Sequence, residues 1–426
     1  MSGGPWRPGR TPEVPARSTA PGVRVVVDVR AIQDPERAPL TAIYLDALLS
    51  ALDADPVAGE SFAFLLSIDR EDPTRRWTSL DVIGRRLLPP TRALRSGALT
   101  VDPLLLRGAS MGAGWRAERG GAQGSVYHAT AGALPIGSGI PVVAALLDLA
   151  PWTLPDAYQG GRAARFGQRI RARILRDAAS VVVASAAAGI DARRALHVRR
   201  ERLRVVPLAP RPQFRPEAAL GPEAADEHVR LGLSGRYAVY AGRYDARQDL
   251  PTLFAALGAL ASEAPPPGVP TGDWPPRVCL VGTTPDDRAL LARDAARAGV
   301  ADALVYEQGL PAERLAGLVA GARILLSPVR SEATGLAALE AIAAGVPVVA
   351  SSVGALQEIV GRAGILVEPG DAARLAVAIR ATWGDGLHAS LAAAAAERAA
   401  SMRTWADVAR DTRAIWAAAA RTAPLL

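Results

Sequence analysis

The chain has 426 residues, of which 50% are hydrophobic, and its formal net charge is +7 at pH 7. This length exceeds what one hydrophobic core usually serves, so the sequence predicts two globular domains. No apolar run reaches the roughly 18 uncharged residues of a membrane span, which favours a protein that is soluble or peripheral to a membrane. Cys279 is the single cysteine, which excludes disulfides within the chain and cysteine-cluster metal sites and favours a reducing cytoplasm.

The positive charge comes entirely from arginine, because the chain contains no lysine. The arginine residues are spread along the sequence, and no nucleic-acid-binding motif accompanies them. The isoelectric point of about 10.2 therefore reflects composition, since guanidinium groups hardly titrate. We expect no nucleic acid as a partner.

The first half of the chain predicts a disordered tail followed by alternating strands and helices. Residues 1–22 are rich in Pro, Arg, Gly and Ser and lack the apolar segment of a signal peptide, so they cannot bury enough surface to become ordered. Apolar runs typical of strands buried on both faces of a parallel sheet then occur at 23–29, 61–68, 126–129, 141–148 and 180–185. Residues 69–123 are irregular and interrupted by proline, and we predict a variable region there.

The same alternation repeats in the second half of the chain. Strands are predicted at 237–241, 278–281, 303–306, 324–326 and 346–350, with Ala- and Leu-rich helices between them. The segment Pro207–Pro216 separates the halves, and its four prolines in ten residues are typical of a stiff linker. Pro265–Pro276 is predicted to be a surface loop. Two such halves predict an α/β fold made of two doubly wound, Rossmann-like domains.

The most specific pattern lies between Ser327 and Gly370. Two glutamates, Glu332 and Glu340, are eight residues apart and flank a glycine-containing turn that opens a helix; a buried strand with the pattern AxGVPVVAS and a loop with Glu358 follow. In this segment the chain resembles retaining glycosyltransferases of family 4, the glycosyl transferases group 1. This large family includes bacterial mannosyl- and glucosyltransferases and sucrose synthase.

The resemblance extends to about residues 23–420. The segment 237–250 (YAVYAGRYDARQDL) looks like the family's strand, Gly-Arg and phosphate-contact segment, and the segment 405–416 looks like its closing helix. The family implies a GT-B fold, with two Rossmann-like domains facing a cleft and a last helix that returns to the first domain. We accordingly predict a tail at 1–22, an acceptor-side domain at 23–209, a nucleotide-sugar-binding domain at 210–400 and the returning helix at 401–426.

The residue types in the two-glutamate segment suit the binding of a nucleotide sugar. Glu340, inside the helix, is expected to accept hydrogen bonds from both ribose hydroxyls. Glu332 precedes the helix and is expected to reach the transferred sugar. The backbone N–H groups of Gly335 and Leu336 are expected to face the distal phosphate, because a helix N-terminus favours negative charge and glycine permits close approach.

Further candidates follow the predicted strand ends. Arg243, after Gly242, is expected to pair with the diphosphate as negative charge develops on departure, and Gly282 marks the next strand end. Gln248 stands where the family has a phosphate-binding lysine, and an amide still donates a hydrogen bond but supplies no charge. Asp148 ends a strand of the first domain, and we assign it, with Glu332 and Arg243, to the catalytic residues.

Several positions depart from the family pattern. Besides Gln248, the glycine-rich turn after the first strand is replaced by Pro39-Leu40-Thr41-Ala42, whose side chains would obstruct a backbone approach to ligand. Leu147 stands where a histidine commonly precedes the strand-end aspartate, and Thr334 stands where an aromatic residue is usual. These changes affect charge or close approach at the expected donor site.

Two hypotheses remain open. One is an active transferase that moves a hexose from a nucleoside diphosphate sugar to an unidentified acceptor with retention of configuration; the other is a non-catalytic relative that binds a nucleotide sugar or another transferase as a scaffold. We expect no cofactor and no metal site. Some of these residues also have a purely structural interpretation. Asp148 could cap a turn, Ser185 could be a helix N-cap, and His128 and Cys279 are interpreted as core residues.

One predicted helix also raises the question of a membrane. Arg162–Ala179 would place Phe166, Ile170 and Ile174 in one apolar stripe, with arginines around it. An ordinary packed helix with a solvated face is the favoured interpretation, because the stripe is narrow. A peripheral contact with an anionic membrane is the alternative.

Overall fold

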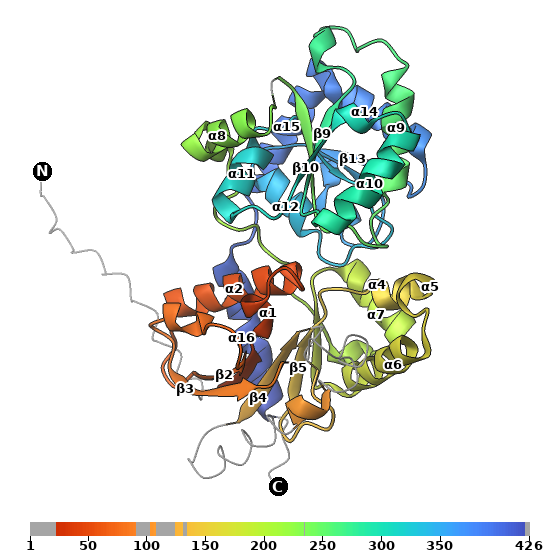
Figure 1. The fold of residues 1–426 in the computed structure, drawn as a ribbon. Coiled ribbons are helices and arrows are strands. Elements are labelled where there is room, and N and C mark those ends of the chain that lie inside the picture. The colour runs from red at the N-terminus through yellow and green to blue at the C-terminus, as the bar shows by residue number, and fades with distance from the viewer. Residues whose placement is uncertain (1–22, 91–102, 108–123, 131–133, 234, 422–426) are drawn as a thin grey trace, which may run out of the picture.

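The computed structural model describes residues 23–90, 103–107, 124–130, 134–233 and 235–421. The expected tail at 1–22 lies outside the described residues, as does much of the expected variable region. The chain forms two α/β domains, which lie one above the other in Figure 1. The segment 207–215 between them contains neither a helix nor a strand.

The N-terminal domain is built on a seven-stranded parallel sheet, counted over the described residues, in the order β3-β2-β1-β4-β5-β6-β7. Its strands are β1 (Arg24–Asp28), β2 (Ser61–Ser67), β3 (Val82–Leu88), β4 (Ser125–Thr130), β5 (Val142–Ala145), β6 (Ser180–Val183) and β7 (Leu203–Val205). Its helices are α1 (Arg30–Gln33), α2 (Pro39–Ala54), α4 (Ala150–Thr153), α5 (Pro155–Tyr158), α6 (Arg162–Asp177) and α7 (Ala186–Leu196).

The C-terminal domain is built on a six-stranded parallel sheet, again within the described part of the chain, in the order β10-β9-β8-β11-β12-β13. Its strands are β8 (Tyr237–Ala241), β9 (Arg277–Val281), β10 (Leu304–Glu307), β11 (Ile324–Ser327), β12 (Val348–Ser351) and β13 (Gly364–Val367). Its helices are α8 (Pro222–Arg230), α9 (Leu250–Ala261), α10 (Pro285–Arg297), α11 (Ala312–Ala320), α12 (Leu336–Ala343), α13 (Leu356–Ile359), α14 (Ala372–Trp383) and α15 (Asp385–Ala399).

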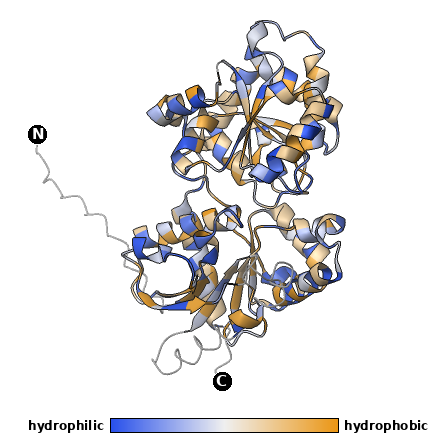
Figure 2. Ribbon diagram, in the orientation of Figure 1, coloured by the Kyte–Doolittle hydropathy of each residue, from blue (hydrophilic) through white to orange (hydrophobic). Residues whose placement is uncertain are grey.

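The sequence predicted every interior strand of both sheets but missed three of the edge strands, β3, β7 and β13. Interior strands are mostly apolar because helices cover both of their faces, and Figure 2 shows hydrophobic residues in the strands of both sheets. The edge strand β3 instead carries Gly84, Arg85 and Arg86, and most of its residues are partly or fully exposed. The predicted variable region at 69–123 therefore contains the strand β3, which the sequence did not indicate because β3 lacks a continuous apolar run.

Both sheets reverse their strand order near the centre, between β1 and β4 and between β8 and β11. In doubly wound sheets the crevice outside the carboxyl ends of the strands at such a point is where ligands bind. The loops after β8, β9 and β11 carry most of the donor-site residues expected from the sequence. The topology thus places these loops at the end of the C-terminal sheet where a ligand is expected.

A last helix, α16 (Trp405–Arg421), returns from the C-terminal domain and packs on α2, β4 and β5 of the N-terminal domain, as predicted. In Figure 1 it lies against the N-terminal sheet. Its Arg413 guanidinium donates to both carboxylate oxygens of Glu60 at 3.1–3.2 Å. The Trp416 ring is buried edge-on against Phe62.

His128 of β4 lies under this helix as a core residue, as predicted, with 1% of its surface exposed. The Trp416 indole Nε1–H donates to His128 Nδ1 at 3.2 Å, and His128 Nε2 lies 3.3 Å from the Tyr44 hydroxyl. Because Nδ1 accepts, the ring is neutral with its proton on Nε2. Burial lowers the pKa of His128 from 6.5 to about 4.

We predict that this histidine makes the fold sensitive to mild acid. The His128 side chain takes up a proton near pH 6.5 in the unfolded chain and near pH 4 in the folded protein. The stability that the fold gains from a neutral His128 is therefore complete above pH 6.5 and is lost as pH falls toward 4. Between pH 7 and 5 the expected loss is about 2 kcal/mol. Urea unfolding of the wild type and His128→Gln at both pH values checks this. An equal pH dependence in the two proteins would contradict it.

Candidate functional site

Two strand ends come together where the sequence places the diphosphate. Gly242 follows β8, and its backbone N–H donates to the carbonyl of Val281, at the end of β9, at 3.0 Å. Gly282 has φ +100, and a Cβ built on it would lie 2.7 Å from the Gly242 carbonyl oxygen. Only glycine fits this backbone conformation and this close approach, so the floor of the candidate site is bare backbone.

The turn before α12 is held by Glu332. Its Oε1 accepts from the backbone N–H of Thr334 at 3.0 Å, from the Thr334 hydroxyl at 3.0 Å and from the backbone N–H of Gly335 at 2.9 Å. Gly335 has φ +65, and a Cβ there would lie 2.3 Å from Ile359. The Gly335 N–H that we expected to face a phosphate is thus directed at Glu332, because a carboxylate near a helix N-terminus stabilises the unpaired amides there.

Glu340, inside α12, has 4% of its surface exposed and forms an ion pair that the sequence did not reveal. Arg211, from the segment between the domains, donates from Nε to Oε1 at 2.5 Å and from Nη2 to Oε2 at 3.0 Å. Burial raises the pKa of Glu340, and hydrogen bonding and charge from Arg211 oppose that shift. The carboxylate expected to bind a ribose is therefore paired in this structure.

The loop after β8 also reaches the N-terminal domain. Arg243 Nη1 donates to the backbone carbonyl of Arg37 at 3.0 Å, in the loop just before α2. The replaced turn Pro39-Leu40-Thr41-Ala42 forms the start of α2. Gln248 is half-buried, bridges to Val329, and places Nε2 3.8 Å from where a Cβ of Gly242 would be. Arg243 and Gln248 thus lie in one loop at the junction of the domains.

Asp148 meets a second arginine of that loop. Its Oδ1 caps the turn after β5 by accepting the Ala150 N–H at 2.9 Å, and it lies 3.3 Å from Arg247 Nη1. Arg247 also forms an ion pair with Asp245 at 2.7 Å. Burial disfavours the charge on Arg247, but the carboxylates of Asp245, Asp148 and Glu332 more than offset this and raise its pKa. The capping interpretation of Asp148 holds, and the residue also joins an ion-pair network between the domains.

Other polar contacts join the two domains near this network. The Glu358 carboxylate accepts the backbone N–H groups of Ala186 at 3.1 Å and Ala187 at 2.7 Å, at the N-terminus of α7. Ser185 is the N-cap of that helix, as one interpretation predicted, and its hydroxyl also donates to the Ala333 carbonyl at 3.4 Å. A carboxylate at a helix N-terminus is favourable, so α13 and α7 stabilise each other across the junction.

Sequence reasoning missed two arginines at the candidate site, Arg211 and Arg247. Gln248 stands at the position of the expected lysine, and Arg247 is adjacent to it. The sequence therefore showed a cation one position away from the missing lysine. Arg211 had no comparable signal, because it lies 129 residues from Glu340 in a proline-rich segment. Arg211 can pair with Glu340 only because the linker passes over α12, and the sequence pattern does not show this path.

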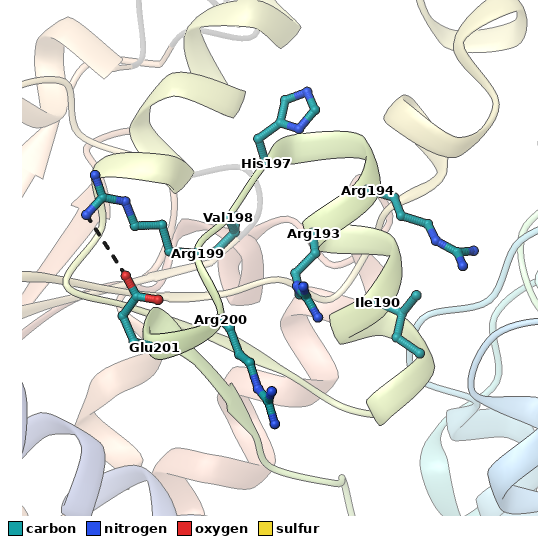
Figure 3. Close-up of a pocket in the computed structure, with 8 residues that line it drawn as sticks. All are labelled: Ile190, Arg193, Arg194, His197, Val198, Arg199, Arg200 and Glu201. Atoms are coloured by element: carbon teal, nitrogen blue, oxygen red, sulfur yellow. Dashed lines mark ion pairs between the residues drawn. The ribbon is translucent and has the colours of Figure 1, made fainter.

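A surface pocket lies elsewhere, at the C-terminal end of α7, and contains none of the predicted site residues. Its lining, drawn in Figure 3, consists of Ile190, Arg193, Arg194, His197, Val198, Arg199, Arg200 and Glu201. Among the described residues, no group of three or more His, Cys, Asp or Glu side chains is arranged to hold a metal ion. No helix in the described part of the chain is both long and apolar enough to cross a membrane.

Part of the chain is similar in sequence to known proteins. Residues 235–385 match the family model described as glycosyl transferases group 1. A D-inositol 3-phosphate glycosyltransferase of Acidothermus cellulolyticus is 41% identical over 26% of this chain and 24% of its own length. One of Streptomyces avermitilis is 33% identical over 49% of this chain and 44% of its own length. The chain thus spans less than half the length of these relatives.

Solved structures match over nearly the whole chain. Sucrose-phosphate synthase from Thermosynechococcus elongatus has a TM-score of 0.67 at 21% identity and covers 93% of this chain and 98% of its own. Anabaena HepE in complex with UDP and glucose has a TM-score of 0.66 at 19% identity, covering 92% and 98%. The glycosyltransferase WaaG has a TM-score of 0.66 at 16% identity, covering 92% and 99%. The chain therefore carries a glycosyl transferases group 1 domain at residues 235–385 within a two-domain GT-B fold.

Proposed function

We propose that the protein is a glycosyltransferase that moves a hexose from a nucleoside diphosphate sugar to an acceptor, with retention of configuration. The observation that carries the proposal is the grouping of Gly242, Arg243, Gly282, Glu332 and Glu340 on the loops after β8, β9 and β11 and on α12, inside the matched domain. Ligands of doubly wound sheets bind outside these strand ends. HepE, a protein of the same fold, has been solved with UDP and glucose and with UDP-glucose, which supports a nucleotide sugar as the ligand.

Each residue has a chemical task in this proposal. Glu340 accepts the ribose hydroxyls, and the bare backbone at Gly242 and Gly282 admits the diphosphate closely. Arg243 stabilises the charge that develops on the diphosphate as the anomeric bond breaks. Glu332 orders the turn before α12 and contributes its carboxylate on the sugar side. Asp148 faces this side from the N-terminal domain, beside Arg247.

The acceptor is proposed only as a class. The relatives named above act, by their names, on D-inositol 3-phosphate, so a polyol phosphate is the first acceptor to test. A scaffold that binds a nucleotide sugar without turnover is the second candidate, favoured by Gln248 and Leu147 at family positions. Incubation with a panel of UDP-, GDP- and ADP-hexoses, with and without D-inositol 3-phosphate, distinguishes the two, because only a transferase releases the nucleoside diphosphate. Nuclear magnetic resonance of the product anomer then tests retention.

The first prediction concerns nucleotide binding. A ligand present at a hundred times its dissociation constant stabilises the folded state by about 2.7 kcal/mol, so UDP or GDP should raise the melting temperature. Glu340→Gln should reduce that rise, because an amide is a weaker acceptor for the ribose hydroxyls than a carboxylate. Glu397→Gln, an exposed change on α15, is the matched control. A wild-type melt that no nucleotide shifts at millimolar concentration would overturn donor binding at this site.

The second prediction concerns the phosphate loop. Hydrogen bonds to charged groups contribute about 1.5–3 kcal/mol and neutral ones about 1 kcal/mol. Gln248→Lys should therefore tighten nucleoside diphosphate binding by up to about tenfold, or about 1.4 kcal/mol. Arg243→Ala should weaken binding by more, because the charge of the neighbouring Arg247 is already matched by Asp148 and Asp245.

Calorimetric titration with one nucleoside diphosphate measures both effects. Gln357→Lys on α13 and the exposed Arg362→Ala control for added and removed charge on the same domain. If Arg243→Ala binds as tightly as the wild type, the diphosphate lies elsewhere and the assignment of this loop is wrong.

A contact with an anionic membrane remains a proposal for α6. The inner side of the helix is packed, with Ile174 and Arg171 buried, which supports the favoured interpretation of an ordinary helix. Phe166 is nevertheless 55% exposed among exposed arginines, and α6 packs on α7, whose end carries the arginine-lined pocket of Figure 3. If the exposed side of α6 around Phe166 binds lipid, the protein should co-sediment with phosphatidylglycerol vesicles but not with phosphatidylcholine vesicles at physiological salt. Phe166→Ala should weaken the co-sedimentation with phosphatidylglycerol vesicles. Equal recovery with both vesicles would exclude it.

A further inference from the structure

The ion pair between Arg211 and Glu340 joins the segment between the two domains to α12 of the C-terminal domain. Glu340 projects from α12 with 4% of its surface exposed, and Arg211 comes from the segment between the two domains with 15% of its side chain exposed. The guanidinium fork meets the carboxylate with one N–H on each oxygen, at 2.5 and 3.0 Å. This bidentate geometry fixes the orientation of the carboxylate as well as its charge.

Arg211 is itself held in place by its surroundings. Pro210 and Pro212 flank it in the sequence and restrict the backbone on both sides. Its guanidinium carbon lies 4.8 Å from the centre of the Phe214 ring, which is buried. A cation over an aromatic face and a stiff backbone reduce the conformational freedom of the arginine before it pairs.

We propose that Arg211 is a positioning residue of the donor site, which keeps the Glu340 carboxylate ionised and oriented so that its remaining lone pairs accept the ribose hydroxyls of a nucleotide. This inference rests on the proposed function, in which Glu340 binds the ribose. A carboxylate offers about four lone-pair positions, and the arginine occupies one on each oxygen. One position on each oxygen remains for a diol.

The environment of Glu340 explains why it needs a cation. A buried carboxylate without a partner takes up a proton, because burial disfavours its charge. The elements packed against α12 include β11 and β12, which carry no titratable side chain, and α11, α13 and α15. These helices carry Glu313, Arg314, Glu358, Asp385, His388, Glu397 and Arg398. Arg211 is the cation that pairs with the Glu340 carboxylate, and its hydrogen bonds and charge oppose the effect of burial on the Glu340 pKa.

A purely structural pair would instead fasten the linker to the C-terminal domain. Losing it would lower the melting temperature and change nucleotide affinity by a factor that does not depend on pH. A pair that competes with the ribose would make affinity rise when Arg211 is replaced. A positioning role predicts a third result, a loss of affinity that grows as pH falls.

The test is the dissociation constant of UDP or GDP, whichever the wild type binds, measured by calorimetry between pH 8 and pH 6. In Arg211→Met the Glu340 carboxyl loses the hydrogen bonds and the charge that oppose the effect of burial, so its pKa rises further and it takes up a proton at higher pH than in the wild type. The ratio of the variant's constant to that of the wild type should then increase as pH falls, by at most about tenfold per pH unit for one proton. Taking the ratio removes the nucleotide's own titration.

Three further variants complete the test. Arg215→Met, an exposed arginine of the same segment, should leave the ratio near one at every pH. Arg211→Gln, which retains a hydrogen-bond donor to Glu340, replaces Arg211→Met if that variant does not fold, with the same expected trend. The double change Arg211→Met with Glu340→Gln should abolish the pH dependence, because the titrating group is gone.

A ratio that is constant with pH, or below one, overturns the positioning role while leaving nucleotide binding intact. A wild type that binds no nucleotide defeats the proposed function itself, and the inference with it. The two failures are therefore distinguishable in one set of titrations.

Discussion

The burial of both faces of two parallel sheets is the constraint on which the rest of this structure depends. Strands covered by helices on both sides carry mostly apolar side chains, so most of the polar chemistry lies in the loops at their ends. The reversal of strand order then brings the loops after β8, β9 and β11 to one place. Gly242, Arg243, Gly282 and Glu332 are close in space for this reason, although they are scattered along the sequence.

Arginine pairing balances the carboxylates that this arrangement brings together. Arg211 pairs with Glu340, and Arg247 pairs with Asp148 and Asp245. A buried carboxylate is costly unless a cation and hydrogen bonds accompany it, and a guanidinium supplies both in a fixed geometry. In a chain without lysine, every such partner is an arginine. The candidate site is therefore more fully paired than the glutamates alone suggest, and a ligand must share these carboxylates with the arginines already on them.

The two domains are joined by several kinds of contact. The linker crosses once, α16 returns to the N-terminal sheet, and Glu358 accepts two backbone N–H groups at the start of α7. Arg243 and Arg247, in the loop after β8, contact Arg37 and Asp148 of the N-terminal domain. Because the same loop carries residues of the proposed donor site, that site and the domain contacts share side chains. A change in one is expected to affect the other.

The sequence by itself determined the two α/β domains and every interior strand, because continuous apolar runs along the chain mark the strands, and the resemblance to the family predicted the returning helix. The edge strands β3, β7 and β13 were not predicted; β3 and β7 carry arginines and exposed residues that interrupt the apolar run, and β13 has only four residues. The family pattern identified Glu332 and Glu340, but their partners depended on the path of the chain in space. Pairing between Arg211 and Glu340 joins residues 129 positions apart through a linker without periodicity, so only the tertiary structure could decide it.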